Sequence, residues 1–245
     1  MRRVEAATVE RDPHASTLAR LLFAGAPSLC NRAGLIGPID LRFSARLLSG
    51  RDLYEEVIRG GVLQAKRSVW IATANLKELY VEGQGLGRRY RSIVASFDEL
   101  AARGVDLRIL HADQPSRRFR AAFDRRPALV AGGLRLKHCP RLHTKAIVID
   151  GERLYLGSAN LTGAGLGAKG EDRRNFELGL VTEEPRLLDE VQSYFDRLWR
   201  GEPCGTCALR DDLCPDPGAY GAGRVRANTT LRRGRPPADP TPGED

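Results

Sequence analysis

The chain has 245 residues, 42% of them hydrophobic, and a formal net charge of +8. This composition predicts a globular domain with one sizeable core, and it argues against a membrane-spanning protein because no apolar run is as long as a bilayer crossing. The positive charge suits a polyanion such as nucleic acid, although a genome that favours arginine codons also explains 34 arginines against five lysines. The charged N-terminus lacks the apolar core of a secretory signal, so the expected location is the cytoplasm.

Helix-like and strand-like segments alternate along most of the chain. The expected helices are 17–26, with Thr17 as N-cap, 51–67, 91–104 and 183–201. The expected strands are 68–76, 105–112, 146–150, 153–159 and 175–182. Because Asp150-Gly151 is typical of a hairpin turn, the predicted fold class is α/β with a mixed β-sheet flanked by helices.

Changes in composition divide the chain into four predicted regions. They are an N-terminal helical segment (1–45), a catalytic domain (46–200), a small cysteine-rich metal knuckle (201–216) and a tail rich in Arg, Pro and Gly (217–245). The composition of the tail predicts disorder.

The stretch "RLHTKAIVIDGERLYLGSAN" carries the candidate chemistry. His143 and Lys145 are two positions apart, as are Ser158 and Asn160 after the hairpin turn, so within strands each pair shares a face. Such a face suits a phosphate group, with Lys145 and Asn160 on the non-bridging oxygens and Ser158 assisting. A histidine there can serve as nucleophile or as general acid or base. No carboxylate cluster with divalent-metal spacing lies nearby, so no catalytic metal is expected.

The pattern His143-x-Lys145-x4-Asp150-x6-Gly157-Ser158-x-Asn160 resembles the signature of the phospholipase D superfamily. The elements between about 50 and 200 also resemble one domain of that fold. The resemblance implies a two-step phosphodiester exchange, in which one histidine forms a phosphohistidine while a second protonates the leaving oxygen and then activates water. It assigns His143 the nucleophile or acid role and makes Lys145, Ser158 and Asn160 phosphate ligands. It leaves Asp150 as a turn residue or an indirect support of the site.

The later sequence "RRNFE" matches a second family position, Asn-x-Glu. The resemblance implies that Asn175 contacts phosphate and that Glu177 orients a ring nitrogen of His143. This chain has one His-x-Lys motif where the family's site needs two, which implies a homodimer with His143 of each subunit in one pocket.

The glycine-containing segment 161–175 follows the motif directly. Its cations Lys169, Arg173 and Arg174 are candidate contacts to neighbouring phosphates of a nucleic acid. A plain flexible loop is an equally good interpretation.

Three of the five cysteines, Cys204, Cys207 and Cys214, are clustered as C-x2-C-x6-C. In a cytoplasmic protein this spacing favours a structural metal site, and Cys139 or Cys30 would supply the fourth thiolate. Cys139 is preferred because it lies just before the catalytic strand, whereas Cys30 has the surroundings of a core residue. A four-iron cluster (4Fe-4S) and zinc both accept four cysteines. The triplet resembles the iron–sulfur staple of some DNA-processing nucleases, and ordinary reduced cysteines are the alternative.

These observations together predict a metal-independent phosphodiesterase. The first hypothesis for its activity is a nuclease that acts on DNA or RNA through a phosphohistidine in a homodimeric site. A phospholipase or phosphatidyl transferase is the first alternative, because the same motif would serve it. A non-catalytic nucleic-acid-binding component of a defence or repair complex is the second.

Overall fold

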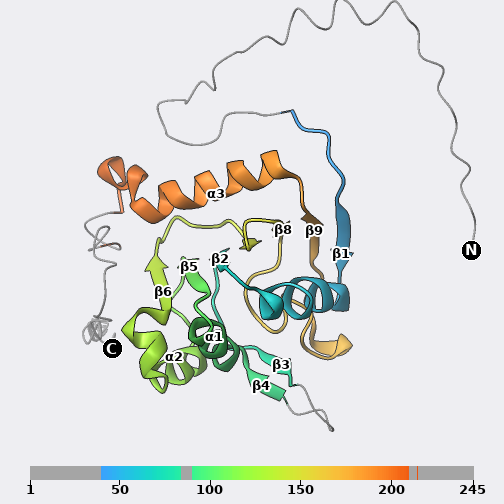
Figure 1. Cartoon of the computed structure of the whole chain (residues 1–245), viewed down its shortest axis with the longest axis vertical. Helices are drawn as coiled ribbons and strands as arrows, with labels where there is room; N and C mark the ends of the chain where they lie inside the picture. Colours follow the sequence, from blue (N-terminus) through green and yellow to red (C-terminus); the bar gives the residue numbers. More distant parts are fainter. Residues whose placement is uncertain (1–39, 84–89, 210–213, 215–245) are drawn as a thin grey trace, which may run out of the picture.

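A seven-stranded mixed sheet forms the centre of the molecule in a computed structural model that describes residues 40–83, 90–209 and 214 (Figure 1). The strand order is β1-β9-β8-β7-β2-β5-β6. The three strands β2, β5 and β6 are parallel, and β7, β8, β9 and β1 each run antiparallel to the preceding neighbour. The strands are β1 (Arg46–Ser49), β2 (Ser68–Thr73), β5 (Asp106–His111), β6 (Leu134–His138), β7 (Ala146–Ile149), β8 (Arg153–Gly157) and β9 (Leu178–Thr182), with β3 (Tyr80–Glu82) and β4 (Tyr90–Ser92) as a separate pair.

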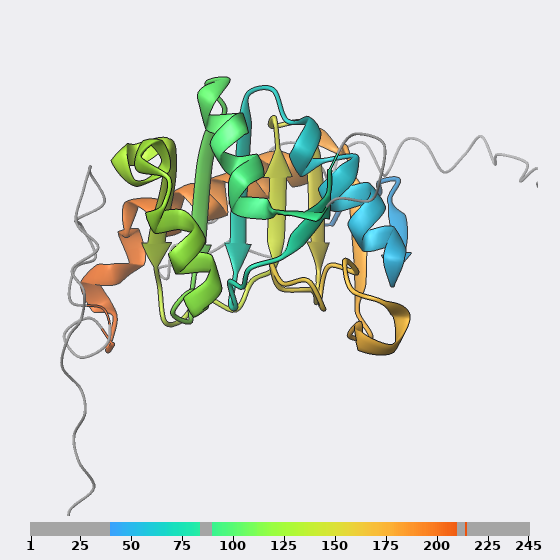
Figure 2. The same cartoon turned by 90° about the horizontal axis from the view of Figure 1, so that it is seen from below.

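Helices cover both faces of this sheet (Figure 2). One core contains side chains of the π-helical segment η1 (Leu53–Arg59), of α1 (Ile93–Ala102) and of α2 (Arg117–Asp124). The other core lies under α3 (Pro185–Arg200). Short helical segments complete the chain: η2 (Val62–Gln64), η3 (Leu129–Gly133), η4 (Glu171–Arg173) and η5 (Glu202–Thr206). The predicted fold class, a mixed sheet flanked by helices, is therefore confirmed.

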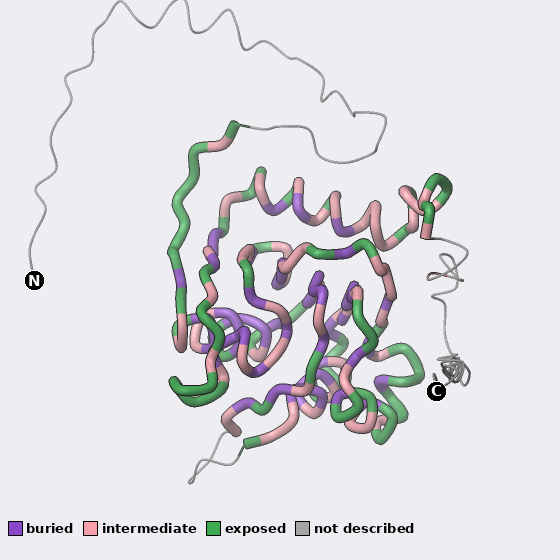
Figure 3. The backbone as a smooth tube through the Cα atoms, turned by 180° about the vertical axis from the view of Figure 1, so that it is seen from behind, coloured by how far each residue is buried: buried purple, intermediate pink, exposed green. Residues whose placement is uncertain are grey.

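The helix α3 shows how closely some boundaries follow from local sequence. Pro185 occupies its first turn and Gly201 ends it in the left-handed conformation, with φ of 76°. Buried and exposed residues alternate along it (Figure 3), because Leu188, Val191 and Phe195 face the sheet at helical spacing. None of the helices in the described ranges has both the length and the apolar character needed to cross a membrane.

The expected helix over 51–67 is wrong in its extent. The structure has η1 and η2 there, separated at Gly60-Gly61. A Cβ on Gly61 would lie 2.5 Å from the carbonyl oxygen of Val57 and 2.7 Å from Ile149, so this position accepts only glycine and brings the chain close to β7. The helix predicted over 17–26, the residue Cys30 and the tail 217–245 lie outside the described residues, and the four region boundaries remain predictions.

The turn residue Asp150, which follows β7, is hydrogen-bonded to the backbone at the start of β2. Its carboxylate accepts hydrogen bonds from the backbone N–H groups of Lys66 (3.0 Å), Arg67 (2.7 Å) and Ser68 (2.9 Å). Burial alone would raise the pKa of Asp150, but these backbone donors prevail and the pKa lies below its ordinary value of 3.8. Asp150 therefore fixes the C-terminal end of β7, whereas His143 lies before the N-terminal end of this strand.

Replacing Asp150 by asparagine is expected to lower the free energy of unfolding by about 1–2 kcal/mol at neutral pH, because one acceptor oxygen and the charge are lost. A carboxyl group whose pKa is depressed on folding stabilises the protein fully above its unfolded pKa and loses this contribution as the pH falls through the folded pKa. Urea denaturation between about pH 7 and pH 3 should therefore show a shallower acid decline for Asp150→Asn than for the parent chain. Parallel declines of the two proteins would contradict this assignment.

Candidate active site

The four polar residues of the main motif lie at one edge of the sheet, just outside its strands. His143 and Lys145 precede β7, whereas Ser158 and Asn160 follow β8. Because β7 runs antiparallel to β8 and β2, it begins where these two strands end. All four residues therefore lie at the same end of these strands. The expectation that each pair shares one face within a strand is wrong: the residues lie outside the strands, and the strand ends bring them to one edge.

The Lys145 ammonium lies against the His143 imidazole. Its Nζ donates to the His143 carbonyl oxygen at 2.8 Å and lies 3.1 Å from Nδ1 and 3.2 Å from Nε2 of the ring. Burial lowers the pKa of Lys145, and the nearby Glu177 carboxylate opposes that shift. His143 itself is exposed, so a reactive ring and a cation stand together where a ligand can reach them.

Asn160 is held in one orientation by the end of β2. Its Oδ1 accepts a hydrogen bond from the backbone N–H of Asn75 at 2.9 Å and one from the hydroxyl of Thr73 at 3.2 Å. Thr73 is buried and its hydroxyl oxygen also accepts from the backbone N–H of Leu161. Since the amide oxygen is occupied, the Asn160 NH₂ group is the end that can donate to a ligand. The motif reasoning missed Thr73 and Asn75, which lie within the expected strand at 68–76.

Ser158, Asn175 and Glu177 form one hydrogen-bonded group. The Ser158 hydroxyl donates to the Glu177 carboxylate, and its oxygen accepts from the backbone N–H of Leu178 at 3.2 Å. The Asn175 amide donates to the same carboxylate at 3.1 Å. The single Ser158 proton is thus directed to Glu177, which makes Ser158 a support for Glu177 in this arrangement.

The predicted role of Glu177, to orient a ring nitrogen of His143, stays a prediction, because a hydrogen bond from the ring to this carboxylate is not among the contacts that these described side chains make. Glu177 nevertheless lies close enough to Lys145 to influence its pKa. The phosphate-contact roles predicted for Lys145, Ser158, Asn160 and Asn175 also stay predictions.

The candidate nucleic-acid residues lie in the segment between β8 and β9. Lys169 and Arg173 are exposed and Arg174 is half-buried. The segment is tied down by backbone hydrogen bonds from Lys169 to Gly163 and from Asn175 to Ala164. The Arg173 guanidinium lies 3.7 Å from the Asp172 carboxylate, so part of its charge is already compensated.

The other two described histidines are committed to backbone carbonyl groups. Nδ1 of His111 lies 3.0 Å from the Asp113 oxygen, and Nε2 of His138 lies 2.7 Å from the Ala112 oxygen. The His111 ring is buried, and this burial lowers its pKa to about 4. Within the ranges that the structure describes, the candidate site therefore contains a single histidine, His143.

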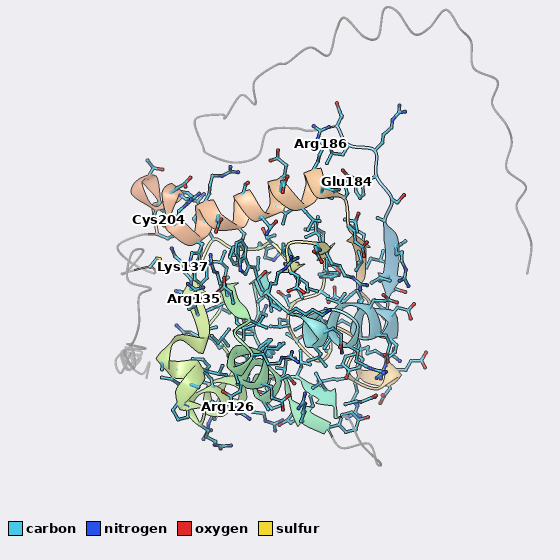
Figure 4. The ribbon with its side chains drawn as sticks, in the orientation of Figure 1. Arg126, Arg135, Lys137, Glu184, Arg186 and Cys204 are labelled. Atoms are coloured by element: carbon cyan, nitrogen blue, oxygen red, sulfur yellow. The ribbon has the colours of Figure 1, made fainter. Side chains whose placement is uncertain are left out.

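Cys139, Cys204, Cys207 and Cys214, here called the cysteine group, gather at the end of β6 beside the C-terminus of α3. All four are free thiols. Burial raises the pKa of Cys139 and of Cys214, and the charges of Cys204 and Cys207 add to this increase. Lys137 on β6 and Cys204 lie side by side (Figure 4). No three His, Cys, Asp or Glu side chains among the described residues stand close enough together to hold a single metal ion.

Residues 61–199 match the family model described as "Cardiolipin synthase, PLD-like domain", in which PLD stands for phospholipase D. The chain is 28% identical over 123 residues to cardiolipin synthases of Geobacillus thermodenitrificans and Geobacillus kaustophilus, a match that covers 47% of this chain. The chain spans only 22% of the length of these curated relatives.

Two solved structures of similar arrangement are Nuc, a phospholipase D family member from Salmonella typhimurium, and NucT from Helicobacter pylori. Nuc is 18% identical with a TM-score of 0.48, over 65% of this chain and 95% of that one. NucT is 20% identical with a TM-score of 0.45, over 64% of this chain and 95% of that one. The family match itself extends over more than half of the 245 residues. The chain therefore belongs to the PLD-like domain family of the phospholipase D superfamily.

Proposed function

We propose that this protein is a phosphodiesterase that cleaves DNA or RNA through a phosphohistidine intermediate in a site shared by two subunits. The observation that carries the proposal is the convergence of His143, Lys145 and Asn160 at one sheet edge, beside the Ser158–Glu177 pair. This set supplies a nucleophile, a fixed cation and a fixed amide donor, which is what transfer of a phosphoryl group requires.

In the first step, a ring nitrogen of His143 attacks phosphorus and forms a P–N bond while the P–O bond to the leaving group breaks. The leaving oxygen takes a proton from His143 of the partner subunit. In the second step, water attacks phosphorus and gives its proton to the partner's His143, and the P–N bond breaks. Lys145 and the Asn160 NH₂ group would hold the non-bridging oxygens throughout.

A second copy of the chain is part of this proposal because the described site has one histidine and the two steps need two. The surface next to the site suits such a partner. Phe176, in the segment that carries Glu177, is fully exposed. Leu178 on β9 and Leu47 on β1 are mostly exposed. Covering these side chains with a second copy would remove apolar area from water.

Nucleic acid is proposed as the substrate because the chain carries a net charge of +8 and because the segment beside the site presents exposed Lys169 and Arg173. The similarity to cardiolipin synthases supports a second candidate, phosphatidyl transfer between phospholipids. Both reactions exchange a phosphodiester, so the same residues would act in each.

The deciding experiment incubates the full chain with single- and double-stranded DNA, with RNA and with vesicles of anionic phospholipid, in the presence of EDTA. We expect cleavage of at least one nucleic acid and no lipid turnover. EDTA should not reduce the cleavage, because Lys145 would serve as the cation of the site. Turnover of phospholipid without cleavage of nucleic acid would replace the nuclease proposal by the lipid one. Inactivity on every substrate would overturn both.

A further inference from the structure

The C-terminal segment that follows α3 is held against β6 by polar contacts. Residues 202–209 and Cys214 include no buried side chain. A segment without apolar burial gains little from the hydrophobic effect, so its fixed position needs another source of stability.

Two contacts tie this segment to residues that flank Cys139, and a third ties the end of α3 to the same place. The Lys137 ammonium donates to the Trp199 carbonyl oxygen at the end of α3. The Cys214 thiol lies 3.9 Å from the His138 carbonyl oxygen. The Arg141 guanidinium hydrogen-bonds to the Cys207 sulfur. These contacts bring Cys139, which directly follows β6, close to the three cysteines of the C-terminal segment.

The backbone around Cys139 is itself fixed. Its N–H donates to the His111 carbonyl oxygen at 2.8 Å, and its own carbonyl oxygen accepts from Leu142 at 2.9 Å. Cys139 also packs against the core under α3. The residue that follows β6 therefore offers one rigid thiol, and the other ligands of a metal site would come from the C-terminal segment.

The charges around the cysteine group suit an anionic centre. A metal centre with four thiolates carries net negative charge, and two cations stand beside it: Lys137, which is only 4% exposed, and Arg141. Four thiols that release their protons on binding a metal would place negative charge beside these two cations.

We propose that the cysteine group binds one metal centre through four thiolates, and that this centre fastens the C-terminal segment to β6. Zinc places its ligands about 2.3 Å away, so four sulfur atoms would lie within about 4 Å of one another. A four-iron cluster takes each thiolate on a separate iron and holds the sulfur atoms further apart. Cys214 is followed by Pro215, as the last cysteine of ferredoxin-type runs is followed by proline, so the iron–sulfur cluster is favoured over zinc.

The test is metal content, which does not depend on the proposed enzymatic activity. The full chain is purified without oxygen, and iron, sulfide and zinc are measured per chain together with the visible spectrum. We expect about four irons per chain and a broad absorption shoulder near about 400 nm. One zinc per chain without colour would still establish the thiolate site and would correct the identity of its metal.

Single cysteine replacements identify the ligands. Cys207→Ser, in a segment without buried residues, and Cys139→Ser should each lower metal content at least tenfold, whereas Cys30→Ser should leave it unchanged. Retained helical circular dichroism shows that the variants fold, and limited proteolysis should cut Cys207→Ser after α3 faster than the parent chain. The proposal is overturned if anaerobic protein holds no stoichiometric metal, even after reconstitution with iron and sulfide or with zinc. It is equally overturned if Cys139→Ser keeps its metal.

Discussion

Replacing His143 by alanine is expected to reduce phosphodiester cleavage by on the order of 10⁴-fold or more, because the only described histidine of the site is lost as nucleophile. Substrate binding should change little, since Lys145 and the Asn160 amide remain in place to hold a phosphate. The measurement is single-turnover cleavage of a labelled oligonucleotide, together with its dissociation constant. A loss of rate without a comparable loss of binding separates a chemical role from a structural one.

The matched control is His14→Ala, which removes a histidine that no part of the proposal uses. It should cleave at the parent rate. If His143→Ala cleaves within tenfold of the parent chain, His143 is not the nucleophile and the proposed reaction is wrong.

Replacing Gly157 by valine is expected to destabilise the fold by about 3 kcal/mol or more. A Cβ at this position would lie 2.5 Å from the Tyr155 hydroxyl, 2.6 Å from the Leu178 carbonyl oxygen and 2.7 Å from the Cα of Gly179. Two of these atoms belong to the backbone of β9, so they cannot move aside as a flexible side chain would. The motif glycine thus allows β8 and β9 to approach each other beneath Tyr155, directly before Ser158.

The free energy of unfolding from urea denaturation checks this expectation. Gly205→Ala is the control, because no atom lies within 4 Å of its added Cβ, and it should change stability by less than about 0.5 kcal/mol. Equal stability of Gly157→Val and the parent chain would mean that β8 and β9 do not pack as closely as described.

The sequence predicted the elements whose signals are local. The Asp150-Gly151 hairpin and the ends of α3 follow from turn and capping residues, and both are present in the structure. The strand β6 was missed because its sequence "LRLKH" places Lys137 at a position that the structure buries. A lysine normally indicates an exposed position, and the Trp199 carbonyl group that accepts from it there lies 62 residues later in the sequence.

The sequence predicted which residues form the candidate site, but it did not predict their hydrogen-bond partners. The motif singled out His143, Lys145, Ser158 and Asn160, and the structure brings them to one edge. The partners of Asn160 come from the end of β2 and the residues after it, 87 and 85 residues away in the sequence, and Ser158 pairs with Glu177 across the β8–β9 edge. These contacts depend on strand order and register, which local patterns do not specify.

The central claim is that two copies of His143 act in one pocket. Parent and His143→Ala chains that carry different tags, co-expressed in equal amounts, would pair at random. A shared pocket predicts about a quarter of the parent activity, because only dimers with two intact histidines react. Activity of about one half, or a monomer that cleaves at full rate, would contradict it.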